Sequence, residues 1–329
     1  MSAACYIQWG CCKFMNNVNN DKQVTNEAVD QIKFSRLAVS LHRYTSDAGN
    51  MYLASIILLI VGNFVSLLFP QQFSMFITYG FVLMALICFS AVYDGLKTSG
   101  FKFANIKDLI CSIIMAVPIF IVITALSSAI QMAMPDMMQS DMNVLFDLCN
   151  KYNIWFLIIP YAVLPAFVEE FEYRGLLLNA FSFKSVVSGI VATSICFAVS
   201  HMSLTNLIQP LAFGLILAFV RIVTKSLWCT VIIHTIYNSI SIILLKYSSN
   251  SAFNWFLNID LIPLIILGVI SVAIIVICFM IMVKNKDLNL DYKYKQFSGG
   301  VSIGCIIGWI ICIIMMFIMI LPNSNVVNN

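Results

Sequence analysis

The segment PAFVEEFEYRG, residues 165–175, concentrates charge in a chain that is otherwise poor in it. Only 10% of the residues are charged and 61% are hydrophobic, yet Glu169, Glu170, Glu172 and Arg174 lie within one short stretch. Ionisable groups are costly inside an apolar segment and are therefore functional candidates there. Two neighbouring carboxylates in a poorly solvated site resist double ionisation, which is the property that a general base or acid requires.

Two further apolar segments carry polar groups at helical spacing. FAVSH ends at His201, and HTIYN runs from His234 to Asn238. Residues four positions apart share a helix face, and this spacing relates Phe197 to His201, His234 to Asn238, and Glu170 to Arg174. The depth of each residue in the membrane can be estimated from the nearest lysine at a helix rise of about 1.5 Å per residue. By this estimate the glutamates, the histidines and the asparagine lie at overlapping depths. The spacing therefore predicts one polar site assembled from three helices.

The elements that carry these residues are predicted to lie in a membrane. Apolar runs recur along most of the 329 residues, and the mean hydropathy is +0.94. A helix of about 20 apolar residues spans a bilayer, whereas a β-barrel would show short alternating segments. The sequence thus predicts an all-α, polytopic transmembrane helical bundle of about nine spans, with eight as the alternative count. The predicted spans are about 51–69, 75–93, 108–131, 153–181, 185–203, 206–224, 227–247, 260–283 and 300–321.

The distribution of lysine and arginine predicts the orientation of the bundle. Basic residues lie in the N-terminal tail and in alternate connections, among them Lys97, Lys184, Lys225 and Lys286. They all fall on one side if the N-terminus is cytoplasmic and the C-terminus is outside. A composition rich in Ile and Asn, with short cytoplasmic loops, favours an integral protein of a bacterial plasma membrane.

Other classes of function find little support in the composition. The net charge of +3 gives no case for binding nucleic acid. Most of the 11 cysteines lie inside apolar runs, where cysteine behaves as a small hydrophobic residue. A transporter with a buried proton relay would show inverted repeats and paired broken helices, and none is visible in the sequence.

The three polar segments together resemble the motifs of a known family. EEFEYRG (169–175), FAVSH (197–201) and HTIYN (234–238) are similar, in this order, to those of the CPBP family. These are the CAAX-protease and bacteriocin-processing intramembrane proteases, also called the Abi family. The resemblance covers about residues 150–245. It implies that the catalytic residues are Glu169, Glu170, His201, His234 and Asn238, with Arg174 and Phe197 in supporting positions. Glu172 matches no position of the family.

The apolar runs, together with the resemblance over the central part, predict four segments in the chain. Residues 1–50 form a polar cytoplasmic segment, in which the spacing of Phe34, Leu37, Leu41 and Tyr44 suits an interfacial helix, with a solvated helix as the alternative. Three transmembrane helices follow in residues 51–131. The catalytic core of four helices occupies residues 150–247, and two further transmembrane helices lie in residues 258–321.

The implied function is that of an intramembrane endopeptidase acting on a peptide or membrane-protein substrate. We expect Glu169 to activate a water molecule that His201 orients, while Glu169 and Glu170 both border the cavity. His234 and Asn238 would stabilise the oxyanion, and Arg174 would hold Glu170. This mechanism requires no cofactor. The alternative is a metalloendopeptidase with a divalent metal such as zinc on Glu169, His201 and His234, although the His-Glu-x-x-His signature is absent.

A non-catalytic function is the second hypothesis. Members of such families confer immunity against peptide bacteriocins, and an inactive member could bind such a peptide without cutting it. The loss of Glu169 or of a motif histidine would favour that hypothesis, but all three residues are present in the chain.

Overall fold

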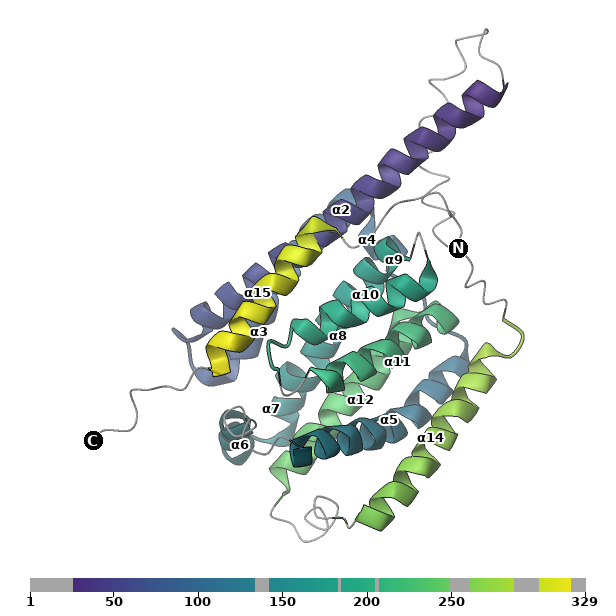
Figure 1. Cartoon of the computed structure of the whole chain (residues 1–329). Helices are drawn as coiled ribbons and strands as arrows, with labels where there is room; N and C mark the ends of the chain where they lie inside the picture. The colour runs from purple at the N-terminus through teal and green to yellow at the C-terminus, as the bar shows by residue number, and fades with distance from the viewer. Residues whose placement is uncertain are drawn as a thin grey trace.

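The computed structural model describes residues 26–133, 142–182, 185–204, 207–248, 259, 261–286 and 302–320, and the regular elements in this part of the chain are all helices (Figure 1). Six of them are long and apolar enough to cross a membrane: Ser40–Ser66, Gln71–Tyr93, Ile106–Ser128, Ile154–Phe181, Leu227–Lys246 and Ile262–Val283. Three shorter apolar helices lie at Val186–Val199, Ile208–Thr224 and Ile303–Ile318. The prediction of a polytopic helical bundle is confirmed. These nine segments of the described chain overlap the nine predicted apolar ranges, but only six are long enough to cross a membrane, so the number of spans stays a prediction.

The first helix, α2 (Asn26–Ser66), passes through the predicted boundary at residue 50 without a break. Leu41 and Tyr44 are buried, and the Tyr44 ring packs against Phe89 and Tyr93 of α3 (Ser74–Tyr93), with ring centroids 5.7 and 5.0 Å apart. These two side chains therefore pack inside the bundle, and they lie neither on the membrane surface nor in solvent, the two alternatives that the sequence left open. The side chains of Phe34 and Leu37 lie outside the described residues.

The fourth span is central in the bundle and is built from five short pieces. They are α7 (Ile154–Ile158), the π-helical η3 (Ile159–Val163), α8 (Leu164–Glu170), the π-helical η4 (Phe171–Leu177) and α9 (Leu178–Phe181). Proline lacks the N–H that an α-helix needs in its interior, and Pro160 lies at the start of η3. The second π-helical piece follows Glu170 directly. Such widened turns occur mostly at functional sites.

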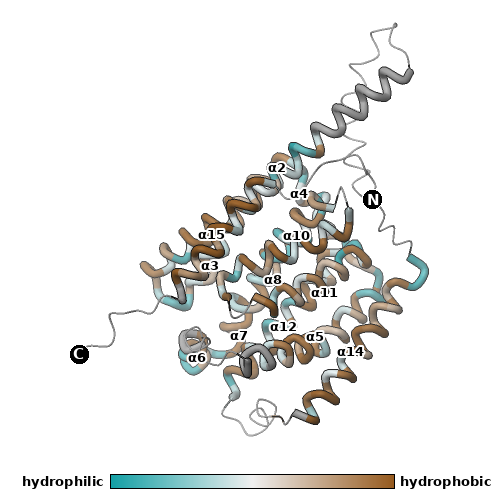
Figure 2. Tube along the Cα trace, in the orientation of Figure 1, coloured by the Kyte–Doolittle hydropathy of each residue, from teal (hydrophilic) through white to brown (hydrophobic). Residues whose placement is uncertain are grey.

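The other helices pack around the fourth span in two groups (Figure 1). The hairpin of α2 and α3 lies on one side, with α15 (Ile303–Ile320) beside α2. On the other side, α10 (Val186–Val199), α11 (Ile208–Thr224), α12 (Leu227–Lys246), α5 (Ile106–Ala133) and α14 (Leu261–Val283) follow one another. Figure 2 shows that α14 and α15 are apolar along most of their length. Exposed side chains such as Ile262 and Ile303 suit contact with lipid.

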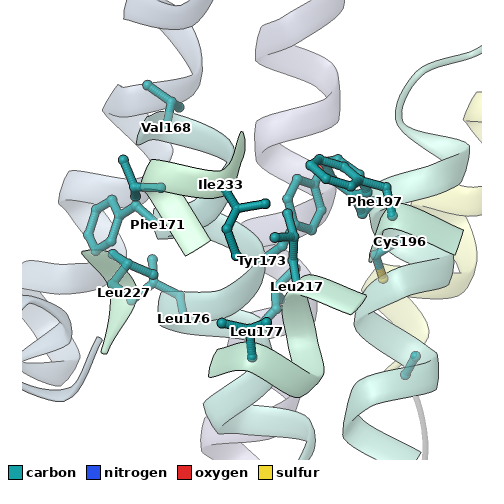
Figure 3. Close-up of a cluster of buried hydrophobic side chains, with 14 of the residues drawn as sticks. Val168, Phe171, Tyr173, Leu176, Leu177, Cys196, Phe197, Leu217, Leu227 and Ile233 are labelled. Carbon is teal, nitrogen blue, oxygen red and sulfur yellow. The ribbon is translucent and has the colours of Figure 1, made fainter. Parts of the chain in front are cut away.

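A buried cluster fixes the helices that carry the polar motifs (Figure 3). Phe171, Leu176 and Leu177 of the fourth span meet Leu217 of α11 and Ile233 of α12. Lipid tails are as apolar as leucine, so helices in a bilayer associate through close packing and interhelical hydrogen bonds. Gly214 of α11 allows such an approach to α10, because a Cβ atom there would lie 3.2 Å from the Cα atom of Ser194. This packing sets the relative positions of the polar side chains.

Candidate active site

A polar cavity of about 110 Å³ lies between the α2–α3 hairpin, the fourth span and the end of α10. A cavity needs only about 10–15 Å³ to hold one water molecule, provided that it is polar enough. Seven residues with polar side chains line this one: Ser55, Tyr79, Glu169, Glu172, Tyr173, Ser200 and His201. The cavity can therefore hold water beside two carboxyl groups and an imidazole, near the middle of the span Ile154–Phe181.

Glu169 connects this cavity to α12. The Tyr79 hydroxyl of α3 donates a hydrogen bond to Glu169 Oε1, and Glu169 Oε2 lies 3.7 Å from Nε2 of His234. The Glu169 side chain is 16% exposed, so water can reach it. A carboxylate that is held in place and accessible to water is suited to accept a proton.

Glu170 faces away from the cavity and is fully buried. Its Oε1 atom accepts hydrogen bonds from Nη1 of Arg174 at 2.7 Å and from Nδ1 of His234 at 2.9 Å. The predicted ion pair between Glu170 and Arg174 is therefore present. The expectation that Glu169 and Glu170 border one cavity is wrong. Positions three apart share a helix face, so Glu172 takes the second place beside Glu169.

Arg174 ties the fourth span to two neighbouring helices. Its Nη2 atom donates to the carbonyl oxygen of Gly214 on α11 at 3.2 Å, and its guanidinium carbon lies 4.4 Å from the ring centroid of Phe197 on α10. The guanidinium is only 1% exposed, so its charge is balanced by Glu170 rather than by water. Arg174 thereby fixes the carboxylate that in turn orients His234.

In each of the two histidines, Nδ1 makes a hydrogen bond that orients the imidazole ring. Nδ1 of His234 donates to the ionised Glu170, which leaves Nε2 facing Glu169. Nδ1 of His201 lies 2.8 Å from the carbonyl oxygen of Phe197. A carbonyl oxygen only accepts, so this nitrogen carries a proton and Nε2 of His201 remains for the cavity. The Phe197 ring packs edge-on against both imidazoles, with centroid distances of 4.9 and 5.9 Å.

Asn238 is the one predicted site residue that does not join this group. It lies one helical turn beyond His234 on α12, half-buried, and it does not line the cavity. Its predicted role as a donor to an oxyanion stays a prediction.

The sequence analysis missed two lining residues, Ser55 and Tyr79, and noted a third, Glu172, without giving it a role. Ser55 and Tyr79 lie in the first two spans, which match no motif, and Glu172 has no counterpart in the family pattern. A search for isolated polar side chains in every apolar segment would have flagged Ser55 and Tyr79, since a polar group in a bilayer needs a partner. The motifs alone do not indicate that α2 and α3 complete the cavity.

The residues of the alternative metal site do not form a coordination site. Among the residues that the structure describes, no three His, Cys, Asp or Glu side chains are grouped so that they could hold a metal ion. Glu169 and His234 approach one another, but they are not joined by His201 in such a group. The donor set predicted for zinc thus does not fit a three-ligand site.

Comparisons with known proteins point to one family. Residues 151–240 match the family model described as Rce1-like, type II CAAX prenyl endopeptidase Rce1-like. This range contains all three polar motifs, and it excludes α2, α3, α14 and α15. The predicted family resemblance is confirmed. No curated protein and no solved structure matches the chain.

Proposed function

Because residues 151–240 match the Rce1-like family model, we propose that this protein is an endopeptidase in which Glu169 activates water within the membrane. The family and the apolar helices support an integral membrane protease that works in a lipid bilayer on peptide substrates. The observation that carries the proposal is the position of Glu169, at the edge of a polar cavity and in contact with both Tyr79 and His234.

The proposed reaction begins with a water molecule in the cavity. Glu169 takes one proton from this water while the oxygen attacks the carbonyl carbon of the peptide bond. Nε2 of His201 accepts a hydrogen bond from the same water and so orients it. Holding the water beside its base saves much of the entropy cost of a bimolecular encounter.

The tetrahedral intermediate needs a hydrogen-bond donor for its negative oxygen. The proton taken by Glu169 is proposed to pass to Nε2 of His234, which lies 3.7 Å from Glu169 Oε2 and must approach to hydrogen-bond distance for the transfer. The second N–H that His234 gains in this way is proposed to stabilise the oxyanion, with Asn238 as a further donor. Glu170 and Arg174 act on this step only by holding the His234 ring.

The substrate is proposed to be a peptide whose apolar part lies in the bilayer. Ile56, Leu59 and Val82 line the cavity beside the polar groups, which suits an apolar group next to the scissile bond. A prenylated peptide of the kind that the family description mentions is one such substrate, and the leader of a membrane-bound bacterial peptide is another.

Peptide termini in the membrane fraction test this function without a known substrate. Bacterial cells that make the protein are compared with cells of the same strain that lack it, and new termini are mapped by mass spectrometry. We expect a set of termini that occurs only when the protein is made. Identical sets in both strains would contradict a protease.

Tyr79→Phe is expected to slow cleavage by about 10- to 150-fold, because it removes a hydrogen bond of about 1.5–3 kcal/mol to a charged acceptor. The aromatic ring remains, so the packing of α3 against the fourth span is kept. Initial rates on a peptide from the mapped site measure the effect. Phe substitution at Tyr93, whose hydroxyl contacts Asp47 outside the cavity, is the matched control, and equal rates for the two variants would refute the role of Tyr79.

Cleavage by the purified protein is expected to survive a metal chelator, because no three-residue donor group exists in the described part of the chain. The rate is measured before and after chelation, and again after zinc is added back. Activity that disappears on chelation and returns with zinc would favour the alternative ligands Glu169, His201 and His234.

A further inference from the structure

Glu172 is a carboxyl group of the cavity that the reaction above does not use. It is only 3% exposed and lines the cavity together with Glu169. Its Oε1 atom is hydrogen-bonded to Oγ of Ser55 on α2. An ionisable group inside a membrane segment is a functional candidate by default.

The hydrogen bonds of Ser55 bear on whether the Glu172 carboxyl group is protonated. Oγ of Ser55 also lies 2.8 Å from the carbonyl oxygen of Tyr52, and a carbonyl oxygen can only accept. A serine hydroxyl supplies a single proton, so Ser55 faces two acceptors, the Tyr52 carbonyl and Oε1 of Glu172, with one donor hydrogen. An ionised Glu172 would have to compete with the Tyr52 carbonyl for this hydrogen, whereas a neutral carboxylic acid supplies a second one, so the arrangement favours a protonated Glu172.

The surroundings of Glu172 agree with this count of protons. The cavity lining includes neither lysine nor arginine, and the guanidinium of Arg174 is bonded to Glu170 and Gly214. A buried carboxylate without a cationic partner is strongly disfavoured and takes up a proton instead. Glu169 differs, because the Tyr79 hydroxyl donates to it and it is more exposed. One cavity thus holds two carboxyl groups in opposite environments, the arrangement in which an acid and a base divide their roles.

We propose that Glu172 is the general acid that protonates the leaving amine, an inference that rests on the proposed function. When the tetrahedral intermediate collapses, the carbonyl re-forms and the C–N bond breaks. The nitrogen takes its proton from the Glu172 carboxyl and leaves as a neutral amine, while the attacking water has become the hydroxyl of the new carboxylic acid.

The same geometry returns the enzyme to its starting state. After one turnover Glu169 holds the proton of the water and Glu172 is ionised. Side chains three positions apart on a helix have Cβ atoms about 5–6 Å apart, and the cavity between them accommodates water. Transfer of a proton from Glu169 to Glu172 restores both groups, and no other reactant is required.

The test compares two leaving groups on a synthetic peptide that spans the cleavage site mapped with the wild-type protein. One substrate has the natural amide bond, and in the other the amide N–H is replaced by sulfur. A thiolate leaves without a proton because thiols are much more acidic than amines. Glu172→Gln is expected to cut the amide at least about 100-fold more slowly than wild type, and the thioester at the wild-type rate.

Two further variants distinguish the loss of a general acid from the loss of a buried polar group and from the loss of water activation. The glutamine side chain can still donate to Ser55, so Glu172→Gln keeps the contact with α2. Thr193→Val, a buried position on α10 outside the cavity, controls for the loss of a polar group and is expected to cleave both substrates normally. Glu169→Gln is expected to cleave neither substrate, because hydrolysis of both the amide and the thioester needs activated water. Equal losses on amide and thioester in Glu172→Gln, or a normal amide rate, would overturn the acid role.

Infrared spectroscopy gives a readout that does not depend on activity. The C=O stretch of a protonated carboxylic acid is expected in wild-type protein and is expected to disappear in Glu172→Gln. A spectrum in which this substitution removes only a carboxylate band would also overturn the proposal. If wild-type protein yields no mapped cleavage site, the proposed function itself fails, and that outcome differs from a Glu172→Gln variant that cleaves normally.

Discussion

Glu169→Gln is expected to lower the rate of peptide cleavage by at least about 100-fold, the lower end of the contribution of a general base. Glutamine has nearly the same shape and its carbonyl oxygen can accept from Tyr79, so α3 and the fourth span stay in contact. The substitution removes only the capacity to take a proton from water. Initial rates of the purified protein in lipid nanodiscs measure the effect.

The control for this variant is another carboxyl-to-amide substitution. Asp147 is exposed on α6 (Met142–Lys151) and does not line the cavity of Glu169, so Asp147→Asn should cleave normally. Equal thermal unfolding of the two variants would establish that Glu169→Gln is folded. Cleavage by Glu169→Gln at the wild-type rate would remove the base from the mechanism.

Arg174→Met is expected to lower the free energy of unfolding by about 3–5 kcal/mol, because breaking a buried ion pair leaves an unpaired charge. Glu170 has no exposed surface, so water cannot replace the guanidinium. The variant also loses the hydrogen bond to Gly214 and the contact with the Phe197 ring. Unfolding in mixed micelles with increasing denaturing detergent measures the change.

The double variant Glu170→Gln/Arg174→Met isolates the charge from the packing. Replacing both partners removes the unpaired carboxylate, so most of the lost stability should return. His234 keeps an acceptor, because the glutamine carbonyl oxygen can take its Nδ1 proton. A double variant that is no more stable than Arg174→Met would indicate that the stability comes from packing.

The parts of the site that depend on local sequence could be predicted, and those that depend on distant helices could not. Glu170 and Arg174 lie four positions apart on one helix, so their pairing follows from helix geometry. The limits of the fourth span follow from its apolar composition, which predicts 153–181 where the structure has Ile154–Phe181. Both features need information from one segment only.

The cavity itself needs information from helices that share no motif. Ser55 and Tyr79 come from α2 and α3, more than eighty positions before Glu169, and nothing in their local sequence indicates this contact. Glu169 and Glu170 are about 100° apart on a helix, so the sequence allowed both to reach the cavity. In the structure only Glu169 reaches the cavity, because His234 on α12 binds the Glu170 carboxylate on the side of the fourth span that faces away from the cavity.

The length of α10 has a consequence for the membrane around the protein. Its 14 residues make a helix of about 21 Å, whereas the hydrocarbon core of a bilayer is about 30 Å thick. Val187 and Val191 are exposed on this helix, and the bilayer adapts to such a mismatch by thinning locally. Such thinning would shorten the path from the hydrated headgroups to His201 at the end of α10, and so would supply the water that the proposed reaction consumes.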